Sequence, residues 1–331
     1  MQLAKSAMLV SANVVNGGLL GERKDDKASA LIEDTYNVAE RRTKASKFLI
    51  DRKHKSVKQV VAASQRVREV VYKYTMPWGD DKTRLLPIKL IDTFKVKIGT
   101  ALAELEEARE NYLTHYPSLV SDSERDLAEL FDRSQYPTVE KARLLFKSKV
   151  TYWPIPDSAH FIAEIAEESA NEAREMIKRE IEDRLIEASY DMVRRAKEVV
   201  SIYVDKLENY KPTKPVIDEN TGYKKRHWRT GKVETEASNG TAFRDSLVEN
   251  VKETARLIEN MNLTGNPEIA KVVKDLNRLS GFAAYHLRKS DAIRAQALTA
   301  GQQMLVNLTM LDLKDQEVSD MVTDASDYMD M

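Results

Sequence analysis

The chain contains no cysteine, few glycines and prolines, and no long apolar run, and each absence narrows what it can be. Zero cysteines among 331 residues exclude disulfides and thiol chemistry and fit a reducing cytoplasm. Eleven glycines and nine prolines leave few helix breakers, so long helices are expected. No apolar run approaches the roughly 20 residues of a membrane-spanning helix, which predicts no membrane partner. The apolar stretch 7–12 is predicted to be a buried strand rather than a signal peptide.

Recognisable catalytic and metal-binding constellations are also missing. The five histidines form no metal-ligand pair, and the sequence has no nucleophile elbow and no zinc-ligand spacing. The glycines at 17, 18 and 21 lack the Gly-Lys-Ser/Thr that completes a phosphate-binding loop. His160 and Glu164 lie four residues apart, but no second pair exists to complete a metal site between helices. The sequence therefore predicts a non-enzymatic protein without a metal or cofactor.

Hydrophobic periodicity predicts a mainly α-helical chain with a small β element. Apolar side chains recur every three or four residues at 57–74 and again at 90–112, which predicts two antiparallel helices joined by a loop at 75–87. Segments 3–22 and 146–152 are predicted to form a small sheet that packs on these helices. The second of these helices is expected to span about 88–115. Further helices are expected at about 28–48, from Ser121 or Asp122, after Thr138, at 267–279 and at 282–311.

The longest predicted helix runs from 158 to about 209, with Asp157 or Ser158 as its cap, and carries a regular apolar seam. The seam repeats every eleven residues, which implies a nearly straight or slightly right-handed supercoil. A shorter helix at 243–261, capped near Asn239 or Thr241, is expected to pack antiparallel to it as an elongated coiled-coil-like arm. Because the shorter helix cannot cover the whole seam, the remainder is predicted to mediate homo-oligomerisation. The self-association seam comprises Ile177, Ile181, Leu185, Met192, Val199 and Tyr203.

Four regions are predicted along the chain. A helical base with a small sheet occupies 1–157, and the antiparallel helical arm occupies 158–262, with a basic tip at 211–240. C-terminal helices follow at 263–311. The acidic segment 312–331 is expected to be disordered or to act as a docking peptide.

The net charge of −1 hides strong segregation of charge along the chain. The stretch 41–73 contains eleven basic residues and only two acidic ones, Asp51 and Glu69. In contrast, 312–331 contains seven acidic residues and one lysine. Basic residues interleaved with aromatic ones, as at the tip, are typical of surfaces that hold a phosphate backbone and stack on bases. A solvated surface is the alternative. The candidate residues for binding nucleic acid or a protein partner are Arg41, Arg42, Arg52, Lys53, Lys55, Lys224, Lys225, Arg226, His227, Trp228 and Arg229.

The loop at 72–87 carries a pattern shared with a known family. Its residues include Tyr74, Pro77, Trp78, Asp80, Asp81 and Arg84. The order Tyr-x-Tyr-Thr-x-Pro-Trp-x-Asp-Asp followed by Arg-Leu-Leu-Pro resembles the signature of a family of uncharacterised bacteriophage proteins. Matching stretches follow in order at 116–117, 136–137, 154–157 and 243–250, so the resemblance covers about 44–266. It implies an accessory role, because some family members are encoded beside a MoxR-like AAA ATPase and a von Willebrand factor A-type protein.

Several functions remain open at this point. The main hypothesis is a cytoplasmic, oligomeric, non-enzymatic phage accessory or assembly protein that serves as an adaptor to an AAA ATPase. The alternatives are a DNA- or RNA-binding protein of phage replication, recombination or packaging, and a virion structural component. A further alternative is an enzyme that uses Asp80, Asp81 and Arg84. A structural interpretation of the same loop makes Trp78 a hydrophobic plug at the end of the helix pair.

Overall fold

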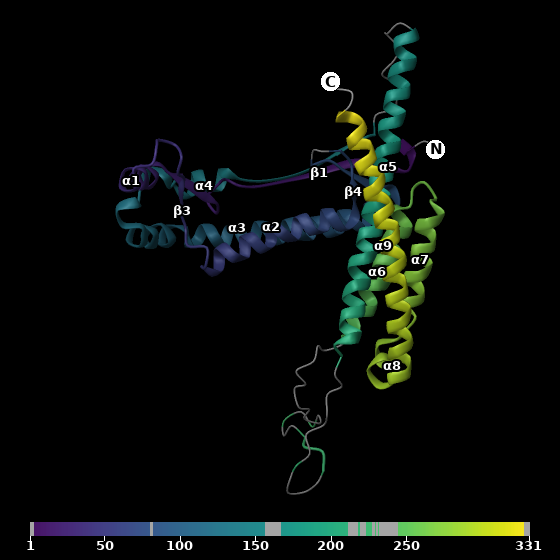
Figure 1. Cartoon of the computed structure of the whole chain (residues 1–331). Helices are drawn as coiled ribbons and strands as arrows, with labels where there is room; N and C mark the ends of the chain where they lie inside the picture. Colours follow the sequence, from purple (N-terminus) through teal and green to yellow (C-terminus); the bar gives the residue numbers. More distant parts are fainter. Residues whose placement is uncertain are drawn as a thin grey trace. The chain divides into compact units, whose positions relative to one another are not determined.

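The chain divides into two compact units, 2–160 and 161–331, which are described separately. The computed structural model describes residues 3–79, 82–155, 167–210, 218, 223–226, 229, 231 and 244–327, and at 167–174 and 313–327 only the helical backbone (Figure 1). The predicted class is confirmed, because the described residues are mainly α-helical and contain a small antiparallel sheet.

A four-stranded antiparallel sheet runs through the N-terminal unit. Its strand order is β4 (Met76–Pro77), β5 (Arg84–Pro87), β1 (Ala7–Asn16) and β6 (Phe146–Trp153), with short 3-10 helices η1 (Leu3–Lys5) and η2 (Ile88–Leu90) beside β1 and β5. The strands predicted at 7–12 and 146–152 are confirmed. The prediction of a simple loop at 75–87 is wrong in part, because Leu85 and Leu86 pair with β1 opposite Leu9 and Met8 and are fully buried.

Two long antiparallel helices, α2 (Lys55–Tyr74) and α3 (Ile91–Leu127), lie side by side in this unit (Figure 1). Helix α2 ends at Tyr74, as predicted from Pro77, which lacks an amide hydrogen and pushes the preceding residue out of the helical region. Its valines at 57, 60, 67 and 71 are buried in the core, which confirms the predicted apolar stripe.

Helix α3 is longer than predicted. The expected end near His115 and the separate helix from Ser121 or Asp122 are wrong, because α3 continues through Pro117 to Leu127. Proline in a helix interior removes one backbone hydrogen bond and costs about 3 kcal/mol. Here the apolar stripe continues past the proline with Tyr116, Leu119 and Val120, all buried, so packing outweighs the local cost.

A small lobe at one end of the N-terminal unit replaces the helix predicted at 28–48. Helix α1 (Asp26–Tyr36) ends at Asn37, whose φ of 51° is left-handed, and β3 (Ala45–Phe48) returns to pair with β2 (Glu22–Asp25). The helix prediction failed because 45–48 gains a strand partner that local periodicity does not reveal. The lobe also contains η3 (Ala128–Leu130) and η4 (Arg133–Gln135). Helix α4 (Val139–Leu145) begins after Thr138, as predicted, and the Thr138 side chain caps it by accepting from the Lys141 amide.

The C-terminal unit is a bundle built from α5 (Glu167–Glu208), α6 (Asp245–Met261), α7 (Pro267–Ser280) and α9 (Asp291–Asp327), with the short α8 (Ala284–Lys289) before α9 (Figure 1). Helix α7 begins and ends as predicted, with the Asn266 side chain accepting from the Glu268 amide. The single helix expected at 282–311 is interrupted at Ser290, whose extended backbone separates α8 from α9. The predicted caps at 157–158 and 239–241 lie outside the described residues.

Helix α9 changes the expected arm in two ways. It runs antiparallel to α5, since Lys197 pairs with Asp312 at 2.6 Å and Gln302 donates to Glu208 at 2.8 Å. Helix α5 therefore packs against α9 as well as against the predicted partner α6, in a bundle rather than a two-helix arm. Of the two expectations for 312–331, disorder is wrong for 312–327, because α9 continues to Asp327, and docking stays a prediction. No proline or glycine interrupts the sequence between 302 and 331.

Candidate functional site

The family-signature loop forms a buried hairpin in the described residues. Tyr74 and Trp78 are only 3% and 5% exposed, in agreement with the structural interpretation of Trp78 as a hydrophobic plug, and Pro77 is half-buried. The Arg84 guanidinium donates from Nε to the Thr75 hydroxyl at 2.7 Å and lies over the Tyr72 ring at 5.3 Å. Arg84 therefore ties β5 to the end of α2. The loop's two aspartates, Asp80 and Asp81, lie outside the described residues, so a site that combines them with Arg84 stays a prediction.

Arg109 is a buried charge that the sequence analysis missed. This side chain of α3 is 2% exposed and donates to the Ser148 hydroxyl at 2.6 Å and to the Val15 carbonyl at 3.1 Å. Burial lowers the pKa of its guanidinium, which the Glu106 carboxylate at 3.7 Å opposes. Arg109 thus joins α3 to β1 and β6. Its position on the apolar stripe, four residues after Leu105, was the signal available in the sequence.

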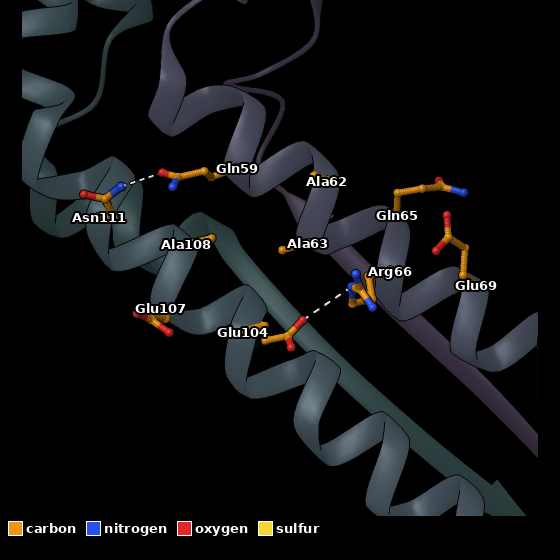
Figure 2. A pocket seen from close by; sticks show the side chains of 10 residues that line it. All are labelled: Gln59, Ala62, Ala63, Gln65, Arg66, Glu69, Glu104, Glu107, Ala108 and Asn111. Atoms are coloured by element: carbon orange, nitrogen blue, oxygen red, sulfur yellow. Dashed lines mark hydrogen bonds and ion pairs between the residues drawn. The ribbon is translucent and has the colours of Figure 1, made fainter. Parts of the chain in front are cut away.

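An open groove lies between α2 and α3 (Figure 2). Ala62 and Ala63 on α2 and Ala108 on α3 line it, and the hydrogen bond from Asn111 to Gln59, at 2.7 Å, spans it. The ion pair between Arg66 and Glu104, at 3.5 Å, joins the same two helices in that view. These are polar links across a close helix contact, and the groove presents no nucleophile–base pair.

The basic residues of 41–58 are exposed on the N-terminal unit, except Lys47, whose side chain is 8% exposed and pairs with Asp25. Arg41 and Arg42 lie in the turn between α1 and β3, and Arg52, Lys53 and Lys55 lie at the start of α2. Arg52 stacks on Phe48 at 4.8 Å. None of these five side chains makes an ion pair with another described residue. This arrangement suits contact with an anionic partner.

The basic tip is described only in part. Lys224, Lys225, Arg226 and Arg229 are exposed, and Arg226 donates to the Gly231 carbonyl at 3.0 Å. Tyr223, beside them, is 79% exposed. The two aromatic members of the tip, His227 and Trp228, lie outside the described residues, so base stacking there stays a prediction. The tip belongs to the C-terminal unit, whereas the basic residues of 41–58 belong to the N-terminal unit.

The seam predicted on α5 divides into two halves. Met192 and Tyr203 are buried, and Val199 is half-buried, within the C-terminal unit, where α6 and α9 pack on α5. Ile177, Ile181 and Leu185, in the N-terminal half, are only half-buried. Two more apolar residues of this half are exposed, Met176 by 71% and Ile186 by 48%. The half that remains open to a second copy is therefore 176–186.

Helix α1 presents an apolar face that the sequence analysis did not single out. Leu31, Ile32 and Tyr36 are 67%, 37% and 74% exposed, and Ser29 is the residue of this helix that is buried. The expectation of a longer helix concealed this face. The 3–4 residue spacing at 28, 31, 32 and 36 was the available signal.

Neither a metal site nor a known relative identifies the chain. Within the described ranges, no group of three or more histidine, aspartate or glutamate side chains could hold a metal ion. His160 and Glu164, the pair considered above, lie outside those ranges. In the same part of the chain, no helix is long and apolar enough to cross a membrane. Comparisons with protein-family models, curated proteins and solved structures found no match.

Proposed function

We propose that this protein is a non-enzymatic accessory protein that works by self-association through the N-terminal half of α5. The observation that carries the proposal is the apolar stretch 176–186, which the helices of the same chain leave half-buried or exposed. Apolar side chains with this degree of exposure gain about 25 cal/mol for each Å² that a partner removes from water. A second copy of the chain carries the same exposed apolar stretch, so two copies can bury it against each other.

Sedimentation velocity across a range of protein concentrations tests this proposal. The full chain is expected to associate, and Ile177→Ser, Ile181→Ser and Leu185→Ser together are expected to weaken association at least tenfold. Ile202→Ser is the matched control, because Ile202 lies on α5 and is also exposed, by 47%, but outside the open half. A full chain that stays monomeric at high concentration, or a triple variant that associates like the control, would contradict the proposal.

The biological setting rests on the sequence resemblance. It supports a phage accessory or assembly role, with an AAA ATPase as the partner that the assembled protein would engage as an adaptor. Co-purification of the full chain with a MoxR-like AAA ATPase tests this part. Capture that persists with the triple seam variant would separate ATPase binding from self-association.

Nucleic-acid binding is the second candidate function, and the exposed basic residues at the start of α2 favour it. Arg52, Lys53 and Lys55 face no ion-pair partner among the residues described. Fluorescence anisotropy with labelled single- and double-stranded DNA over a salt series tests this function, because phosphate contacts make log affinity fall steeply with log salt. Glutamate at these three positions, or at Lys224, Lys225, Arg226 and Arg229, is expected to abolish such binding. An unchanged affinity in both variants would exclude it.

A further inference from the structure

We infer that the apolar face of α1 and the basic turn beside it form a docking surface for the acidic C-terminal segment, 312–331, of a second copy of this chain. For this surface we use the name α1 face, which comprises Leu31, Ile32 and Tyr36 with Arg41, Arg42 and Lys44. The inference deepens the proposed self-assembly. It uses a surface separate from the α5 seam, so an experiment can contradict the docking inference without contradicting the α5 proposal, and the reverse.

The apolar part of the α1 face is the first observation. An eleven-residue helix normally buries one stripe against its own unit, yet α1 buries a serine and leaves three large apolar side chains exposed. Contiguous exposed apolar residues rimmed by polar ones mark interaction sites. A nucleic-acid backbone would use the basic rim but gains little from Leu31 and Ile32. A partner with both apolar and acidic side chains uses the whole surface.

The basic rim of the α1 face is Arg41, Arg42 and Lys44. It is held against α1 by hydrogen bonds of the neighbouring residues Thr43 and Ala45. The Thr43 amide and hydroxyl donate to the Glu33 carboxylate at 3.3 and 3.1 Å, and the Ala45 amide donates to the Ser29 hydroxyl at 3.0 Å. These bonds fix Arg42 and Lys44, which flank Thr43, beside the helix. Both side chains are exposed.

The acidic residues of the lobe do not neutralise this rim. Asp25 pairs with Lys47 at 2.8 Å, Asp26 pairs with Lys24 at 2.7 Å, and the Glu33 carboxylate accepts from Thr43. Three exposed acidic residues of the lobe, Asp34, Glu40 and Glu129, have no such contact within the described part of the chain. Five basic residues without an ion pair there outnumber them, namely Arg23, Lys27, Arg41, Arg42 and Lys44.

The chemistry of the C-terminal segment complements the α1 face. Residues 313–331 contain six acidic residues against Lys314, and Leu313, Val318, Met321 and Val322 are interleaved with them. The seventh acidic residue of the segment, Asp312, pairs with Lys197 of its own chain. The segment is helical as far as Asp327, so it can dock with little of the ordering cost that a disordered peptide meets. Opposite charge guides the encounter and selects the partner. Because donor and acceptor surfaces differ, the contact is heterologous and joins copies head to tail.

The absence of cysteine makes a sharp crosslinking test available. Two full-length variants, Ala30→Cys and Ser326→Cys, each carry one thiol, and one of them carries a mass tag. We expect a short bismaleimide to join the two variants when they are mixed. Val96→Cys replaces Ala30→Cys as the control, because Val96 is 67% exposed on α3, away from α1. The control is expected to give at least tenfold less of the mixed product.

Charge exchange decides whether the contact is specific. Arg41→Glu, Arg42→Glu and Lys44→Glu together are expected to reduce the mixed product at least tenfold. Asp320→Lys, Asp324→Lys and Asp327→Lys in the Ser326→Cys partner are expected to restore it. Leu31→Ser tests the apolar part and is expected to reduce the yield without affecting folding, since Leu31 is exposed.

Three outcomes would overturn the inference. A further variant carries both cysteines in one chain. If this variant crosslinks within the chain at any concentration while the mixed single-cysteine variants do not crosslink, the segment folds back on its own copy. Equal yields with Ala30→Cys and Val96→Cys would mean random collision. Loss of DNA binding in the charge-reversed α1 variant, with crosslinking unchanged, would assign the rim to nucleic acid. If the α5 seam variants stay associated while this contact forms, the seam proposal fails and the docking inference stands.

Discussion

At the scale of single residues, three buried tyrosines show which hydroxyls contribute to stability. Tyr112 and Tyr116 on α3 are fully buried, and neither hydroxyl has a hydrogen-bond partner among the described residues. Burial raises the pKa of Tyr116 to about 12 and raises that of Tyr112 still further. The Tyr136 hydroxyl, by contrast, donates to the Leu49 carbonyl at 2.8 Å. The three residues are therefore similar in burial but different in hydrogen bonding.

Phenylalanine substitutions at these positions should separate the two cases. Tyr112→Phe is expected to leave the free energy of unfolding unchanged or slightly raised, because it removes a buried polar group that lacks a partner. Tyr136→Phe is expected to lower it by about 1–2 kcal/mol, because the Leu49 carbonyl is left buried and unpaired. Urea unfolding of both variants is the measurement. A larger loss in Tyr112→Phe than in Tyr136→Phe would show that the Tyr112 hydroxyl is satisfied, for instance by an internal water.

The Asp25–Lys47 pair makes a residue-level prediction about pH. The hydrogen bond from Lys47 lowers the pKa of Asp25, and the Ala28 amide, which the same carboxylate caps, lowers it further. A depressed carboxyl pKa stabilises the fold above the unfolded value of about 4, and this stability is lost as the pH falls through the folded pKa. Asp25→Asn should therefore reduce stability at pH 7 and flatten the loss of stability as the pH falls below about 4. Thermal melts over that range test this, with Asp92→Asn on exposed α3 surface as the control.

At the scale of the elements, a glycine sets how closely α9 approaches α5. A Cβ on Gly301 would lie 2.7 Å from the Val204 side chain, whereas a Cβ on Gly99 of α3 would meet nothing within 4 Å. Alanine gains about 1 kcal/mol over glycine in a helix interior. Overpacking in a tight contact costs about 1–3 kcal/mol.

These opposing terms predict opposite signs at the two positions. Gly99→Ala should stabilise its unit by about 1 kcal/mol. Gly301→Ala should be destabilising by about 1 kcal/mol, because the clash with Val204 exceeds the gain in helix propensity. Val204→Ala should then lower the free energy of unfolding less in the Gly301→Ala variant than in the wild type. Calorimetry on the four variants checks the signs, and a stabilising Gly301→Ala would mean that α9 shifts freely along α5.

The elements also show where sequence reasoning worked and where it could not. The end of α2 before Pro77 and the start of α4 at Thr138 were predictable, because both depend on local backbone chemistry. Pro117 misled the prediction for α3, since buried Tyr116 and Leu119 hold the helix together across it. Strand β3 was missed because it depends on pairing with β2, which is set by tertiary structure.

The candidate site was predictable only in part, for a similar reason. Charge segregation is a property of the sequence, so the exposed residues Arg41, Arg42, Arg52, Lys53 and Lys55 were found. The division of the α5 seam was not, because α6 and α9 both pack on α5, with Gly301 of α9 beside the buried Tyr203, and no periodicity specifies the course of α9 along α5. Arg109 was overlooked because a charged residue on an apolar stripe is normally assigned to the surface.

At the scale of the whole molecule, the division into two units predicts that they unfold separately. Each unit has its own buried core, with Phe94 and Leu105 in one and Ile258 and Leu276 in the other. Single compact domains usually unfold in one cooperative transition, and two domains commonly give two. Gly99→Ala should then move only one transition, and Gly301→Ala only the other. A single transition that both variants shift would show that the units unfold as one.

The sheet of the N-terminal unit bears on whether strands of two molecules can pair edge to edge. Strand β6 lies at one edge of that sheet, and it carries Lys147 and Lys149, both exposed. Lysines on an edge strand oppose the addition of a further strand from another molecule, because their charges would be buried or brought together. Amyloid-like growth from this edge is thereby disfavoured. The exposed apolar residues of α1 and α5 can then lie close to those of other copies without the sheet edge starting fibre growth.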